Sequence, residues 1–85
     1  MISDTEIRNQ VRAILGSRPD DETIPEPYIL MALGQFFGRG NVSAEQMMKA
    51  LRWNADRGWV ESRRNRDLER DEWKLTERGR IKEGL

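Results

Sequence analysis

The chain contains neither cysteine nor histidine in its 85 residues, and this limits how so short a sequence can become stable. Without cysteine there are no disulfide bonds and no thiolate metal sites. Without histidine, the commonest metal ligand and the commonest general base are both missing. A chain of this length buries only about 60–65% of the surface that its unfolded form exposes. We therefore expect a fold held by one small apolar core, with no metal and no cofactor.

Apolar side chains are numerous enough for such a core. They make up 36% of the chain and include three tryptophans, two phenylalanines, one tyrosine and four methionines. The 15 basic and 15 acidic residues balance, whereas disordered chains usually combine a strong net charge with few large apolar residues. We expect a single folded domain over residues 1–85.

Two capped helices are predicted on either side of a more apolar one. Ser3 with Glu6, and Ser43 with Gln46, have the spacing of a capping box. One face of the first helix is apolar and comprises Ile7, Val11, Ile14 and Leu15. The residues expected in solvent on this helix are Arg8, Gln10 and Arg12.

Residues 28–37 are apolar on nearly every side of a helix that begins at Pro27. A helix of this kind is typical of a central, buried position, and Met31 is interpreted as a core residue. The run is shorter than the roughly 20 residues that cross a bilayer. Because the N-terminus is also polar and charged, we expect a cytoplasmic protein without a signal peptide.

The third helix runs from Ser43 to about residue 57, and Asn54 on its apolar side needs a hydrogen-bond partner if buried. A strand is predicted over residues 59–62 and another over residues 72–75, joined by a long charged connector, residues 63–71. A short extended piece is expected at Thr23–Ile24, and Thr76 is expected to cap a final short helix. Trp59 and Trp73 are interpreted as core residues in contact across the paired strands.

From Val42 onward the chain resembles winged helix-turn-helix regulators of the MarR and PadR type. The resemblance lies in VSAEQMMKALRWNADRGWVESRR and DEWKLTERGR. Such proteins have a capped recognition helix that ends in glycine, an aromatic or aliphatic pair that opens the first wing strand, and a second strand that runs into Leu-Thr-x-x-Gly. The expected fold class is α+β, mainly α: a three-helix winged helix-turn-helix with a two-stranded β-hairpin wing and a short C-terminal helix.

The zero net charge hides a basic middle segment. Residues 39–66 contain seven basic and three acidic residues, a net charge of +4, whereas residues 1–38 carry −3 and residues 67–85 carry −1. A DNA-binding winged helix needs positive charge on its recognition helix and wing. The residues predicted to bind DNA are Gln46, Lys49, Arg52, Trp53, Arg57, Arg63, Arg64 and Arg66. The first three would face base edges, and the last four would face phosphates.

Two of these assignments have an alternative. The wing arginines could instead pair with Asp67, Glu69 and Asp71. Trp53 lies beside the polar face of its helix, where it could stack on a partner or pack against the wing of its own domain.

No residue pattern supports catalysis. The acidic run at residues 20–22 lies in a loop, and no serine has a histidine as its base. We expect a non-enzymatic DNA-binding protein, either a transcriptional regulator or an accessory factor of bacterial or phage type, that binds double-stranded DNA and gains specificity as a homodimer or with a partner protein. The alternative is a protein-interaction winged helix, an adaptor or inhibitor that does not bind DNA. A structural subunit of a phage particle is a third hypothesis.

Overall fold

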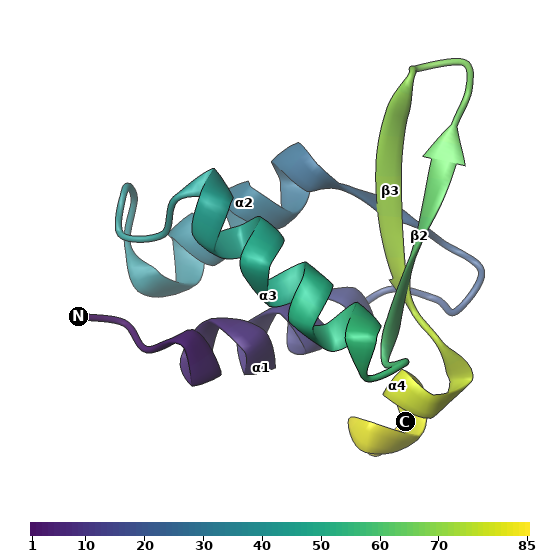
Figure 1. Cartoon of the computed structure of the whole chain (residues 1–85), viewed down its shortest axis with the longest axis horizontal. Helices are drawn as coiled ribbons and strands as arrows, with labels where there is room; N and C mark the ends of the chain where they lie inside the picture. Colours follow the sequence, from purple (N-terminus) through teal and green to yellow (C-terminus); the bar gives the residue numbers. More distant parts are fainter.

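The computed structural model describes residues 1–85 as four helices and three short strands. In chain order the elements are α1 (Asp4–Gly16), β1 (Ile24–Pro25), α2 (Glu26–Phe37), α3 (Ala44–Asp56), β2 (Val60–Asn65), β3 (Arg70–Leu75) and α4 (Glu77–Lys82). The fold is therefore α+β and mainly helical, as predicted. Figure 1 shows α3 in front of α1 and α2, with the β2–β3 hairpin rising beside the end of α3 that lies near α4. No helix is both long and apolar enough to cross a membrane.

Side-chain caps fix the predicted starts of α1 and α3. The Ser3 hydroxyl accepts a hydrogen bond from the backbone N–H of Glu6 at 3.1 Å, and the Ser43 hydroxyl accepts one from Gln46 at 3.1 Å. The carboxamide oxygen of Gln46 also accepts from the backbone N–H of Ser43 at 2.8 Å. These bonds satisfy N–H groups that the first turn of a helix leaves free.

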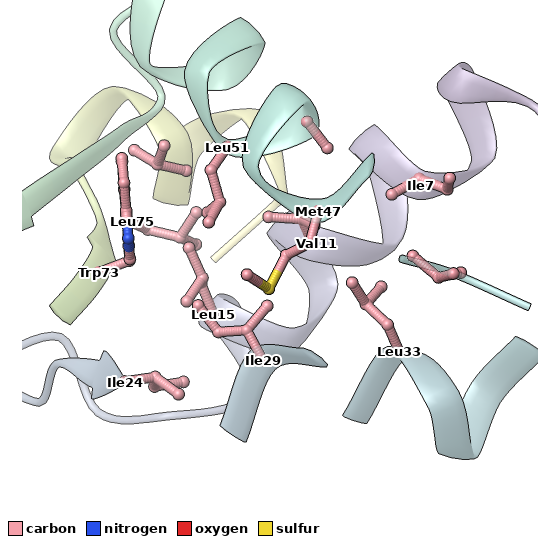
Figure 2. Close-up of a cluster of buried hydrophobic side chains, with 13 residues drawn as sticks. Ile7, Val11, Leu15, Ile24, Ile29, Leu33, Met47, Leu51, Trp73 and Leu75 are labelled. Carbon is pink, nitrogen blue, oxygen red and sulfur yellow. The ribbon is translucent and has the colours of Figure 1, made fainter. Parts of the chain in front are cut away.

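One cluster of 13 buried apolar side chains lies where the first three helices meet the sheet. Figure 2 shows side chains from α1, α2, α3, β1 and β3 converging on it, with Trp73 and Leu75 on the sheet side. The apolar faces predicted for α1 and α3 supply much of it, through Ile7, Val11, Leu15, Met47, Ala50 and Leu51. The sequence patterns of these two helices therefore identified their inner faces correctly.

The prediction that α2 is buried on every side is wrong. Ile29 and Leu33 are buried, but Tyr28, Met31 and Phe36 are 54%, 54% and 63% exposed. The neighbours of α2 are α1, α3, β1 and β3, and they cover Ile29 and Leu33. The apolar residues on its other side therefore remain at the surface.

The strands form a three-stranded antiparallel sheet in the order β1–β3–β2, so the predicted two-stranded hairpin has a third strand beside it. The extended piece expected at Thr23–Ile24 lies one residue further along, at Ile24–Pro25, and forms this strand with Ile24 opposite Trp73. Trp73 is buried as predicted. Its other neighbour across the sheet is Ser62. Trp59 precedes β2 rather than lying on a paired strand, so its predicted contact with Trp73 is wrong.

The hairpin has longer strands and a shorter turn than the sequence indicated. Pairing continues from Val60 opposite Leu75 to Asn65 opposite Arg70, which leaves only residues 66–69 as the turn. The side-chain oxygen of Asn65 accepts from the backbone N–H of Leu68 at 3.1 Å and closes this turn. Charged residues thus lie on paired strands where a long loop was expected.

Candidate nucleic-acid interface

The outer face of α3 carries two acidic and two basic side chains. The four exposed charged residues of α3 are Glu45, Lys49, Arg52 and Asp56. Lys49 places its Nζ 3.3 Å from a carboxylate oxygen of Asp4 on α1. Arg52 has no carboxylate within 4 Å and is free to bind a partner. Positive charge on this helix is therefore available at Arg52 and only partly available at Lys49.

Gln46 lies at the rim of α3 and is half-buried. Its carboxamide oxygen already accepts the hydrogen bond from Ser43 in the capping box. A bidentate contact with an adenine edge needs both the amide oxygen and the amide nitrogen. Gln46 must therefore give up or share its cap bond to read a base in the predicted way.

Two arginines lie against the ring of Trp53. The guanidinium carbon of Arg57 is 3.4 Å from the ring centroid and that of Arg8 is 4.3 Å away. The ring also contacts Trp59, at 5.8 Å between centroids and tilted by 59°. Cations over an aromatic face are attracted by its quadrupole. The half-buried indole therefore holds two positive charges beside α3 and has little free surface on which a base could stack.

A second pair of cations faces Trp59. Lys82 of α4 and Arg12 of α1 lie 4.8 Å and 5.0 Å from its ring. Together with the contacts of Trp53, this cluster joins α1, α3 and α4. Sequence reasoning missed Arg8 and Lys82 because their partners are distant in the chain.

Arg12 is not in solvent as predicted but is only 6% exposed. Its guanidinium donates to Asn54 at 2.9 Å, to Glu83 at 3.1 Å and to Asn9 at 2.6 Å. Asn54 is fully buried, and its amide donates to the backbone carbonyls of Arg8 and Ala50 at 3.2 Å and 2.9 Å. Every buried polar side-chain atom has a partner. The expectation that Asn54 has partners is confirmed, and its side chain joins α3 to α1.

A tight junction joins the base of the hairpin to α3 and α4. The Thr76 hydroxyl donates to the carbonyl of Gly58 at 2.5 Å and accepts from the N–H of Gly79 at 3.0 Å. The backbone N–H of Thr76 also donates to the carbonyl of Trp59 at 3.0 Å. A Cβ at position 79 would overlap that carbonyl oxygen. The Leu-Thr-x-x-Gly pattern therefore fixes the direction in which the hairpin leaves α3.

The three hairpin arginines predicted to bind DNA, Arg63, Arg64 and Arg66, are exposed, and two of them have carboxylate partners. Arg63 lies 3.1 Å from Glu61, and Arg64 lies 3.5 Å from Asp71. Of the three acidic partners considered from the sequence, only Asp71 is used. The arginine side chains in these pairs are 65% and 56% exposed, and such pairs contribute little to stability. Arg66, in the turn, has no carboxylate within 4 Å.

Glu72 on β3 connects the hairpin to the segment before β1. Its carboxylate accepts from Thr23 at 2.7 Å, from Asn65 at 2.9 Å and from Arg70 at 3.0 Å. These hydrogen bonds, with that of Thr23 the largest cause, hold the pKa of the Glu72 carboxyl below its ordinary value. The ionised carboxylate therefore holds the middle of the hairpin against the segment that leads into β1.

The predicted residues thus divide into two groups. The six cations are all exposed, namely Lys49, Arg52, Arg57, Arg63, Arg64 and Arg66, whereas Gln46 and Trp53 are half-buried. All eight lie on α3, on the hairpin or at the junction between them. No group of three or more Asp, Glu, His or Cys side chains is arranged to hold a metal ion. The arrangement offers cations for binding an anionic partner.

Compared with known protein families, with curated proteins and with solved structures, the chain gives no match.

Proposed function

We propose that this chain is a winged helix-turn-helix DNA-binding protein, acting as a transcriptional regulator or as an accessory factor of bacterial or phage type. In this assignment α2 and α3 form the helix-turn-helix, α3 is the recognition helix and the β2–β3 hairpin is the wing. The order of elements supports the assignment, because a hairpin directly follows a third helix that is itself joined to the second by a short turn.

The observation that carries the proposal is the exposure of all six predicted cations on two consecutive structural units. Arg52 on α3 and Arg66 in the turn of the hairpin are free of carboxylates, and Arg63 and Arg64 make only exposed ion pairs. Phosphates can displace the carboxylates from such exposed ion pairs, because these pairs are weak. Binding is favoured further because it releases counterions condensed on the DNA. The cations of α3 would enter the major groove while those of the hairpin follow the sugar–phosphate backbone.

Salt dependence distinguishes this contact from other modes of binding. The logarithm of the association constant for mixed-sequence duplex DNA should fall linearly with the logarithm of salt concentration. The slope should be about −5 if all six cations contact phosphates, and shallower if fewer do. Fluorescence polarisation of a labelled duplex measures both the affinity and the slope.

Charge reversal locates the contact. Replacing Arg63, Arg64 and Arg66 together by glutamate should weaken binding on the order of 100-fold at low salt and reduce the slope. The matched control replaces the same residues by lysine, which keeps the charge, so most of the salt-dependent affinity should remain. Equal affinity of the glutamate variant and the wild type would show that the hairpin does not contact DNA.

A protein-interaction role is the second candidate, and the balanced outer face of α3 favours it. Two acidic and two basic side chains share this face, and Asp4 already neutralises one of the basic ones. DNA repels Glu45 and Asp56, whereas a protein surface with the opposite pattern accommodates them. If no duplex binds at low salt, this role becomes the leading one. The probe is then Arg52→Glu rather than Trp53→Ala, because Trp53 also supports the fold.

A further inference from the structure

The outer side of α2 is the largest concentration of exposed apolar side chains on any helix. Tyr28, Met31 and Phe36 are each more than half exposed, and half-buried Ala32 lies among them. Scattered apolar residues on a protein surface are ordinary, but a group of them on one helix commonly marks an interface. This face is distinct from the cations of α3 and the hairpin.

The spacing of these residues makes the face complementary to itself. Tyr28, Ala32 and Phe36 follow at i, i+4 and i+8, so they form one ridge of the helix. The ridge is large at both ends and small at its centre. If two copies pair antiparallel about Ala32, each Tyr28 meets the partner's Phe36 and the two backbones approach closely at the centre. A two-fold axis repeats every contact, as an isologous dimer requires.

Met31 and Gln35, four residues apart, form a second ridge on the outer side of α2, and grooves lie beside it. Met31 and Gln35 line two adjoining surface grooves, one reaching Ile14 and Ile24 on the α1 side and the other reaching Val42. Helices pack by placing the ridges of one into the grooves of the other. The ridge of a second copy of α2 can therefore pack into the grooves beside Met31.

Charges at the two ends of α2 also favour a second copy in antiparallel orientation. Glu26 begins α2 and accepts a hydrogen bond from the Trp73 indole at 2.9 Å, and Glu22 lies just before β1, 3.8 Å from Arg18. Arg39 follows the C-terminal end and has no carboxylate within 4 Å. Antiparallel pairing brings each Arg39 toward the acidic end of the partner's α2. The net charge of zero means that two copies do not repel each other overall.

We infer that the chain forms a two-fold symmetric homodimer through the outer side of α2, with the two helices antiparallel and Ala32 next to the axis. Because one helix per copy supplies the contact, the dimer buries less than the roughly 1,200 Å² that stable complexes bury. The dissociation constant is expected on the order of 10–100 µM. The inference concerns a face outside the proposed DNA interface, so it does not depend on DNA binding.

Analytical ultracentrifugation of the full chain without DNA tests the dimer. The weight-average mass should rise from monomer toward dimer between about 5 µM and 1 mM. Met31→Arg places a charge in the contact twice and should raise the dissociation constant at least about tenfold. Leu68→Arg is the matched control, because Leu68 is 56% exposed in the turn of the hairpin, and it should leave the constant unchanged. A wild-type chain that remains monomeric at about 1 mM, or equal effects of the two variants, would overturn the inference.

A cysteine cross-link tests the position of the axis. The chain has no cysteine of its own, so a single introduced thiol reacts only with its copy. Under mild oxidation Ala32→Cys should form disulfide-linked dimers at least about ten times faster than Ala13→Cys, whose site is exposed on α1. Similar rates for the two variants would contradict pairing about Ala32.

Discussion

The two ends of the β2–β3 hairpin differ in how firmly they are held. At the base, the carbonyls of Gly58 and Trp59 accept hydrogen bonds from Thr76, and Gly79 packs so closely that no side chain fits. At the tip, residues 66–69 form a turn in which every residue is exposed. Along the strands between them, Glu72 holds the middle while the arginine pairs remain open to solvent.

This difference separates the residues that hold the hairpin from those that can bind a partner. The base fixes the direction of the hairpin relative to α3, so substitutions there act on folding. The tip contributes little to the fold, so substitutions there can act on binding alone. The number of arginines in the sequence does not make this distinction, because it counts buried Arg12 and exposed Arg66 equally.

The largest effect on stability is expected from Gly79→Ala. The added methyl group overlaps the Trp59 carbonyl, so α4 or the start of β2 must move and the bonds of Thr76 are strained. We expect the free energy of unfolding to fall by about 3 kcal/mol or more. Thermal unfolding followed by circular dichroism measures this as a midpoint lowered by more than about 10 °C.

Gly34→Ala is the control for that substitution. Gly34 lies in the interior of α2 without a positive φ, and the nearest atom to an added Cβ is 3.9 Å away. Alanine there should raise the free energy of unfolding by about 0.5–1 kcal/mol. If both alanine variants changed the midpoint of thermal unfolding alike, the close contact between Gly79 and the Trp59 carbonyl would be contradicted.

Arg12→Ala should have the next largest effect. It removes the partner of Asn54 and Glu83 inside the fold, and a buried group that loses its partner costs its desolvation energy. We expect the free energy of unfolding to fall by about 2–4 kcal/mol in urea titrations. Arg63→Ala, which breaks only an exposed ion pair, serves as the comparison and should shift the unfolding curve very little.

Glu72→Gln should produce a smaller change that depends on pH. Because the folded-state pKa of Glu72 lies below its ordinary value, its contribution is present above the unfolded pKa. It is lost as pH falls through the lower folded pKa. The wild type should therefore lose stability over this acidic range, and the glutamine variant should lose less. Unfolding midpoints measured between neutral pH and about pH 3 test this, and parallel curves would contradict it.

The smallest effect on stability is expected from the exposed arginines of the hairpin, two on β2 and one in the turn. Replacing Arg63, Arg64 and Arg66 together by alanine should change the thermal midpoint by no more than about 3 °C. The same variant should show a clear loss of affinity for duplex DNA in polarisation titrations. A fall in the midpoint as large as that of Arg12→Ala would mean that the arginine pairs hold the hairpin.

Features that depend on neighbouring residues were predictable from the sequence. The caps at Ser3 and Ser43 and the inner faces of α1 and α3 follow from spacing within a few residues, and the structure agrees. The hairpin was also predicted, although its strands extend further than the sequence indicated, because backbone pairing continues to Asn65 opposite Arg70.

Features that depend on distant partners were not predictable. Arg12 is buried because it donates hydrogen bonds to Asn54 and Glu83, which lie 42 and 71 positions away in the sequence. Helical periodicity reports only on neighbouring residues and therefore predicted that Arg12 lies in solvent. The exposed side of α2 was misread because periodicity reports how apolar a helix is, not how many neighbours cover it. The Trp53–Trp59 contact, at 5.8 Å, depends on how the chain turns at Gly58.

The most direct test of DNA binding by α3 and the hairpin is to map the binding surface residue by residue. Backbone amide NMR spectra of the ¹⁵N-labelled chain, recorded with and without a short duplex at low salt, report which residues sense the ligand. The largest shift changes are expected on the outer face of α3, at Arg57 and on the hairpin at residues 61–70, with Thr76 and Gly79 almost unchanged. Shift changes concentrated on another surface, or none at saturating DNA, would contradict it.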